Sequence, residues 1–127
     1  VGYLRIGPVS NFTAPEVHLP GLGLLIHHDD RGWYAMSTMC TYDLSRLERK
    51  ETPQGLIWSS QYTESQYDNG GHVIHGPAKA DLPFLKMVLE ASILGGPRDT
   101  LYVMDGIEVS RDWRLKVPEP ASVPAGQ

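Results

Sequence analysis

The chain has 127 residues, of which 41% are hydrophobic and 20% charged, and its 11 Lys and Arg against 15 Asp and Glu give a formal net charge of −4. This is the size and composition of one globular domain, and the acidic balance argues against DNA or RNA as a partner, because nucleic-acid-binding surfaces concentrate basic residues. There is no run of about 18 apolar residues, so no membrane-spanning segment is expected, and the single cysteine, Cys40, excludes an internal disulfide.

Short apolar runs separated by Gly, Pro, Asn and Asp predict strands along most of the chain. A turn at residues 29–32 joins two of these runs into a hairpin, residues 68–71 form the strongest turn signal, and residues 105–106 predict a further turn. Only residues 44–50 suggest a short helical turn. The pattern predicts an all-β sandwich or barrel, with strands over residues 1–6, 16–19, 22–28, 33–37, 56–59, 72–75, 84–89, 100–104 and 107–109.

The last residues of the chain differ from the rest. Residues 117–127 are rich in proline and show no periodicity, which predicts an extended tail lying on a partner surface. We therefore expect the folded domain to occupy residues 1–116.

Histidines and hydroxyl residues are the first candidates for chemistry. In strands, the adjacent His27 and His28 point to opposite faces, and so do His72 and His75. No metal-ligand spacing links them to Cys40, although a metal- or haem-binding module built from these five residues stays open as an alternative. Serines 59 and 60 lack the Gly-x-Ser-x-Gly elbow of hydrolases, so we expect no catalytic residues and no enzyme.

A longer pattern is more specific. Residues 36–42 (MSTMCTY), 55–68 (GLIWSSQYTESQYD) and 71–78 (GHVIHGPA) together resemble the Rieske iron–sulfur family. That family has Cys-x-His, about sixteen residues, Cys-x-x-His, a Gly-Ser-x-Tyr-Asp-like stretch and Gly-Pro-Ala. The resemblance covers most of the chain. It implies a Rieske-like β-sandwich with a small cluster-binding subdomain inserted between strands, whose loops are residues 39–45, 59–68 and 76–78.

The resemblance fails at the cluster ligands. In the family, two Cys thiolates hold one iron and two His imidazoles hold the other. Hydroxyl groups are poor substitutes, because their pKa lies well above that of a thiol. We therefore expect no 2Fe–2S cluster and no other cofactor or metal. The four ligand positions are Cys40, Tyr42, Ser60 and Thr63, and the positions of an additional cysteine pair in the quinol-oxidising branch are Ser45 and Tyr62.

The residues around the ligand positions do match the family. The resemblance assigns Ser65 and Tyr67 to the hydroxyls that bond the cluster and one of its cysteines, and residues 76–78, with Gly76 and Pro77, to the loop that covers it. We expect these residues to hold the empty loops in shape. We also expect Tyr42 and Tyr62 to fill much of the volume that a cluster would leave.

The resemblance then implies a function without electron transfer. We expect a cluster-free, Rieske-like subunit with a structural or assembly role in a larger electron-transfer complex, periplasmic or membrane-associated on the periplasmic side. Its partners would be subunits that carry haem or iron–sulfur clusters, and the tail from Val117 and the region of Pro15 and Pro20 are the expected docking segments. An electron-carrying Rieske 2Fe–2S protein or oxidoreductase subunit is the alternative, which iron content would distinguish.

Overall fold

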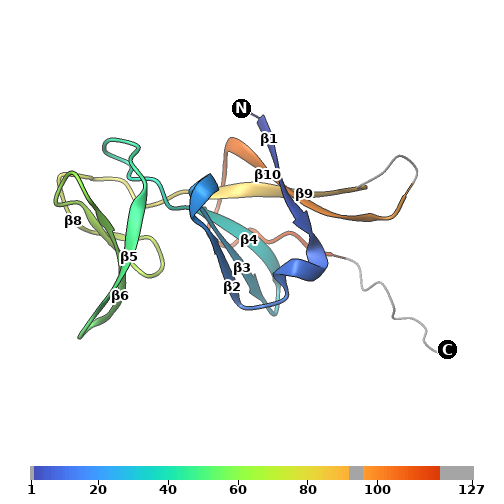
Figure 1. The fold of residues 1–127 in the computed structure, drawn as a ribbon, viewed down its shortest axis with the longest axis horizontal. Helices are drawn as coiled ribbons and strands as arrows, with labels where there is room; N and C mark the ends of the chain where they lie inside the picture. Colours follow the sequence, from blue (N-terminus) through green and yellow to red (C-terminus); the bar gives the residue numbers. More distant parts are fainter. Residues whose placement is uncertain (1, 92–95, 118–127) are drawn as a thin grey trace.

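The computed structural model describes residues 2–91 and 96–117, and this part of the chain is all-β (Figure 1). Most of the predicted tail lies outside the described residues. None of the helices in the described part has the length and apolar character needed to cross a membrane. The elements are β1 (Gly2–Pro8), η1 (Val9–Phe12), β2 (Glu16–Leu19), η2 (Pro20–Leu22), β3 (Leu24–Asp29), β4 (Gly32–Ser37), β5 (Leu47–Thr52), β6 (Gly55–Ser60), β7 (Gln66–Asp68), β8 (Val73–His75), β9 (Phe84–Ala91) and β10 (Arg98–Val109).

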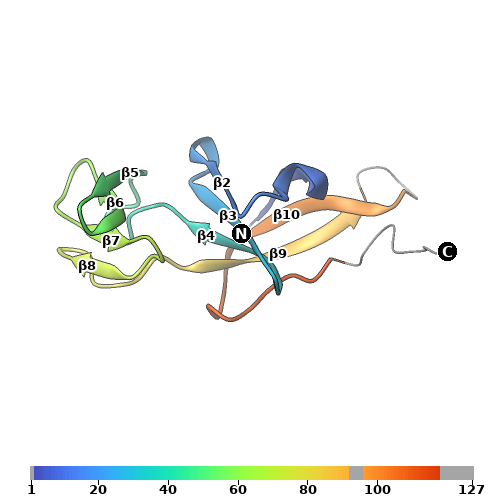
Figure 2. The same ribbon diagram turned by 90° about the horizontal axis from the view of Figure 1, so that it is seen from below.

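The strands form two antiparallel sheets. The large sheet has the order β1-β10-β9-β4-β3-β2, and the small sheet has the order β5-β6-β7-β8. In sequence, the whole small sheet lies between β4 and β9, and Figures 1 and 2 show it at one end of the molecule. The large sheet curls: the short helix η1 contacts β1 and β10 and also β3, which lie in separate parts of the strand order. Phe12 of η1 is buried in the space that this curl encloses.

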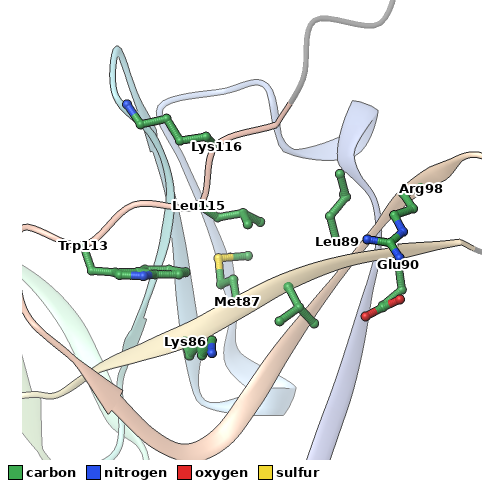
Figure 3. A pocket seen from close by; sticks show the side chains of 9 residues that line it. Lys86, Met87, Leu89, Glu90, Arg98, Trp113, Leu115 and Lys116 are labelled. Carbon is green, nitrogen blue, oxygen red and sulfur yellow. The ribbon is translucent and has the colours of Figure 1, made fainter.

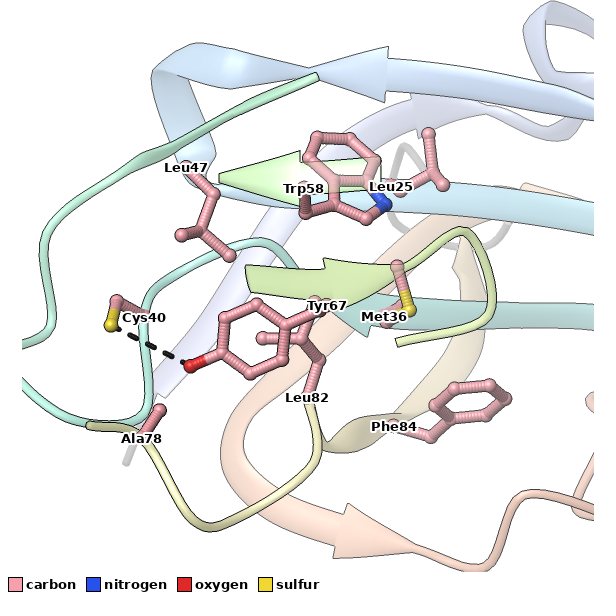
Figure 4. Packing of buried hydrophobic residues seen from close by; sticks show 9 residues of the cluster. All are labelled: Leu25, Met36, Cys40, Leu47, Trp58, Tyr67, Ala78, Leu82 and Phe84. Carbon is pink, nitrogen blue, oxygen red and sulfur yellow. Dashed lines mark hydrogen bonds between the residues drawn. The ribbon is translucent and has the colours of Figure 1, made fainter. Parts of the chain in front are cut away.

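Three strands of the large sheet bury side chains on both faces. In β3, Leu24 and Ile26 belong to a core cluster inside the large sheet, whereas Leu25 belongs to a second cluster that includes Trp58 and Tyr67 of the small sheet (Figure 4). The alternation of side chains along a strand produces this division. It explains why residues 22–28 are a continuous apolar run: β3 lies between two cores. Adjacent buried residues of β4, and likewise of β9, are divided between the same two clusters.

The two sheets are also joined by an arginine. Arg111 donates hydrogen bonds to the carbonyl oxygens of Gly70 and Leu82, and its guanidinium lies 4.4 Å from the ring centroid of Phe84. Gly71 in the adjoining turn has φ of 91°, and a Cβ there would approach the Met36 sulfur to 2.7 Å. The β7–β8 turn therefore packs directly against β4, and only glycine fits at this position.

Two local predictions were wrong. Residues 44–50 do not form a helical turn, because residues 47–52 pair with β6 from Leu47↔Ser60 to Thr52↔Gly55, and this pairing outweighs the helix propensity of the segment. Residues 105–106 do not end a strand either. Strand β10 continues through Gly106, which has φ of 87°, and its register against β9 shifts between Val103 and Glu108. Where a turn was expected, the strand pairing is irregular, because β10 advances from Val103 to Glu108 while β9 runs only from Met87 to Leu85.

Candidate functional site

The two loops that match the Rieske ligand loops lie at the same end of the small sheet. Leu47 opens β5 and pairs with Ser60, the last residue of β6. The loop before Leu47 and the loop after Ser60 are therefore neighbours, while the β5–β6 turn lies at the other end of the hairpin (Figure 1). The loop at residues 76–78 lies against the second of these loops, because the Ala78 N–H donates a 3.0 Å hydrogen bond to Ser65 Oγ.

Cys40 and Tyr67 meet in the buried centre of this end. Both side chains are fully buried, and the Tyr67 hydroxyl donates to Cys40 Sγ at 3.5 Å (Figure 4). The same hydroxyl accepts from the Thr41 N–H at 3.0 Å and lies 2.9 Å from Thr41 Oγ1, which donates to Ala80 O at 2.7 Å. Thr41 of the first loop is thus tied both to Tyr67 of β7 and to the segment after residue 78.

Hydroxyl groups close the second loop. Ser60 Oγ accepts from the N–H groups of Tyr62 and Thr63, both at 3.1 Å. Thr63 Oγ1 donates to Ser65 Oγ at 2.9 Å and accepts from the Ser65 N–H at 3.1 Å. Ser65 Oγ also accepts from Ala78, as noted above, so it connects two loops. Hydroxyls at two positions that the resemblance assigns to cluster ligands therefore bond to the protein's own backbone and to Ser65.

Burial and hydrogen bonding also set the protonation of this region. Burial raises the pKa of Tyr67, although the hydrogen bond from Thr41 partly opposes this, so the phenol remains protonated and able to donate at neutral pH. Hydrogen bonds from the hydroxyl and N–H of Ser45 lower the pKa of Asp43. Ser45, which the resemblance places at a cysteine position, thus holds an exposed carboxylate in the first loop.

The residues at the four ligand positions do not fit a Rieske cluster. Cys40 is the only thiol in the sequence. The hydroxyls of Ser60 and Thr63 are engaged as described, and the Tyr42 ring is 60% exposed. Rieske clusters need two thiolates and two imidazoles, and no group of three or more His, Cys, Asp or Glu side chains that could hold a metal occurs within residues 2–91 and 96–117.

The expectation that two tyrosines fill the place of a cluster was wrong. Tyr42 is exposed, and Tyr62 is 77% exposed. The side chains buried beside these loops are instead those of Tyr67 and Trp58, together with Cys40, Leu47 and Ala78 (Figure 4). Both expected rings lie in loop segments outside the strands, where nothing fixes a side chain toward the core.

The four histidines singled out from the sequence lie in separate environments. His27 stacks on Tyr34 and His28 stacks on Trp33 in the β3–β4 hairpin. In the small sheet, His72 Nδ1 lies 3.2 Å from a carboxylate oxygen of Asp81. His75 Nδ1 lies 3.0 Å from Glu64 O and 2.8 Å from Gly76 O. Each has a partner of its own, and none of them contributes to a shared cluster of the kind that holds a metal in the described part of the chain.

Three relevant residues were not identified from the sequence. Thr41 links Tyr67 to Ala80, and its position directly after Cys40 was the available signal. Leu44 is 73% exposed and has φ of 63°. Its helix-forming neighbours in the sequence predict a helical turn instead of this exposed, left-handed conformation. His18 packs edge-on against Trp58 between the sheets, with ring centroids 5.1 Å apart. Its place beside the small sheet depends on long-range packing.

Searches against protein-family models, curated proteins and solved structures found no match to this chain.

Proposed function

We propose that this chain is a Rieske-like domain without a cluster and that it serves as a structural or assembly subunit of an electron-transfer complex on the periplasmic side of a membrane. The family part of this proposal depends on the sequence resemblance described above. Loss of three ligands removes the route for an electron through the domain. What remains is a β-domain whose loop end can dock on other subunits.

The observation that supports the proposal best is the closed hydroxyl network of the loops. Ser60, Thr63 and Ser65 form hydrogen bonds within the second loop, and Ser65 also accepts one from Ala78. Tyr67 bonds to Thr41 and Cys40. Hydrogen-bonded loops of this kind hold their shape without iron, since the buried polar groups are satisfied within the protein. An electron-carrying protein would instead need these positions as metal ligands.

The rim of the same loops supports a docking role. Tyr42 and Leu44 in the first loop and Tyr62 in the second are large apolar side chains exposed to solvent. Two neighbouring loops therefore present apolar rings and a leucine around a polar, internally satisfied centre. Aromatic side chains exposed in this way are typical of protein–protein interfaces.

Iron content tests the cluster-free part of the proposal. Iron and acid-labile sulfide are measured in protein purified anaerobically, and an EPR spectrum is recorded after reduction. We expect neither iron nor a Rieske signal in the unaltered protein. The triple variant Tyr42→His/Ser60→Cys/Thr63→His restores the family ligands and should take up iron on reconstitution. Two irons per unaltered chain would overturn the cluster-free proposal, and a folded triple variant without iron would overturn the family assignment of the loops.

A second experiment tests the structural role. The tagged protein is purified from its native membranes, and haem and iron in the copurifying subunits are quantified. Leu44→Asp and Tyr62→Asp should release those subunits, whereas Tyr3→Asp, at an exposed tyrosine of the large sheet, should retain them. Equal retention by all variants would contradict docking through the loops.

A further inference from the structure

A groove of about 510 Å³ runs along β9 in the large sheet (Figure 3). One wall consists of residues 86–90 of β9, and the other consists of Trp113, Leu115 and Lys116 near the C-terminal end of the described chain. Side chains on a strand alternate between its two faces. Contact with five consecutive residues indicates a groove along the backbone edge of β9, and Arg98 of β10 lines one end of it.

This edge is open because β4 leaves β9 after two residues. Strand β9 pairs with β10 along its length, but it pairs with β4 only at Ala35↔Leu85 and Met36↔Phe84. Nearer its start, β4 pairs with the C-terminal segment instead: Trp33 N–H donates to Leu115 O at 2.9 Å, and Leu115 N–H donates to Trp33 O at 2.8 Å. The two strands therefore separate around the groove.

Arg114 fixes the far wall of the groove. Its Nε donates to an Asp29 carboxylate oxygen at 2.9 Å, and its guanidinium lies 3.8 Å from the ring centroid of Tyr34. The neighbouring Leu115 and Trp113 pack against the core of the large sheet. The wall facing β9 is thus held in place before anything binds.

The open edge offers hydrogen-bonding groups to an added strand. Alternate residues of an antiparallel strand direct their N–H and C=O groups away from the strand already paired. On the side away from β10, no strand in the described part of the chain pairs with residues 86–91. Leu89, which is partly exposed, supplies apolar surface beside this edge. These are the features that let an extended peptide join a sheet.

The charges at the groove select the kind of peptide. Lys86, Arg98 and Lys116 line it together with a single acidic residue, Glu90. None of the three basic side chains forms an ion pair among the described residues. The groove is therefore basic on a chain whose formal net charge is −4.

We infer that the groove binds an extended, acidic segment of a partner polypeptide, which joins the large sheet as a strand beside β9. The inference depends on the large sheet alone and is independent of the cluster loops, so the two proposals can fail separately.

The test uses a synthetic peptide of alternating Glu and Val, roughly eight residues long as in a typical strand. Binding to the full chain is followed by NMR, through the Trp113 indole resonance and hydrogen exchange of the residue 86–90 amides. We expect the peptide to bind and to slow this exchange. A peptide with Lys in place of Glu, and a Glu peptide N-methylated at alternate residues, should each bind at least about tenfold more weakly, since they lose the charge match or the N–H donors.

Variants of the chain complete the test. Lys86→Glu/Lys116→Glu should weaken binding of the Glu peptide, whereas Lys50→Glu, at an exposed lysine of the small sheet, should leave it unchanged. Failure of the Glu peptide to bind, or equal binding of the N-methylated peptide, would overturn the inference. Binding only after removal of residues 118–127 would make the chain's own end the occupant, and protection of β9 by concentration-dependent dimers would make it a second copy; both results would overturn it.

Discussion

The loop end of the small sheet and the groove on the large sheet satisfy their polar groups in opposite ways. At the loop end, the hydroxyls of Ser60, Thr63, Ser65 and Tyr67 bond within the protein, and apolar side chains face solvent. Along β9, apolar side chains line the walls, and the backbone edge lacks a partner strand in the described chain. The first surface can therefore bind chiefly by packing, while the second can bind by backbone hydrogen bonds.

Removing the buried support of the loop end should have the largest effect. Trp58 is fully buried between the sheets, and Trp58→Ala should lower the free energy of unfolding by about 3–5 kcal/mol, because it leaves a large cavity. Urea denaturation measures this loss. Tyr62→Ala, at an exposed ring of the loop that follows β6, should change stability by no more than about 0.5 kcal/mol. Similar losses in the two variants would contradict the division into buried centre and exposed rim.

The hydroxyl network should show the next largest effect. Ser65→Ala removes the acceptor of two hydrogen bonds, from Thr63 Oγ1 and from the Ala78 N–H. A buried donor left without a partner costs about 1–3 kcal/mol, so we expect a loss of that size in urea denaturation. Ser45→Ala is the matched control, because the Ser45 hydroxyl bonds only to the exposed Asp43. An unchanged stability of Ser65→Ala would mean that the network does not hold the loops.

Arg114 offers the corresponding test at the groove. Arg114→Ala removes the ion pair with Asp29 and the contact with the Tyr34 ring, which together should cost about 1–2 kcal/mol. Hydrogen exchange of the Leu115 amide should accelerate more than that of the Tyr67 amide. Arg114→Lys keeps the charge but loses the planar guanidinium, so we expect an intermediate result. Equal acceleration at both amides would indicate global destabilisation instead of local opening of the groove wall.

The sequence predicted the local elements better than the contacts between them. Residues 16–19 form β2 as expected, and the hairpin across residues 29–32 is present, because alternation and turn residues determine both. The β5 strand was missed, since only its pairing with β6 distinguishes it from a helical segment. At the loop end, the sequence identified Cys40 and Tyr67 but could not predict which hydroxyl bonds to which loop. Nor could it predict the groove, which depends on where β4 leaves β9.

The smallest expected effect is a change of stability with pH, which involves two histidines outside the loop end and the groove. Burial lowers the pKa of both His18 and His27, and His18 Nε2 is buried without a hydrogen-bond partner among the described residues. The unfolded chain therefore binds protons more readily than the folded one below about pH 6.5. Stability should be fully present above that pH and should decline as the pH falls from 7 to 5.

The expected decline can be assigned to these histidines by substitution. The hydrogen bond from Arg49 holds the pKa of Glu16 below its usual value, so this neighbouring carboxylate stays ionised between pH 7 and 5. The double variant His18→Gln/His27→Gln should then show a flatter dependence of the urea midpoint on pH than the unaltered chain. The effect is small because both side chains are only partly buried. A midpoint that rises on acidification would show that the protonated histidines are stabilised in the fold, most directly by Glu16, and would reverse the sign assigned here.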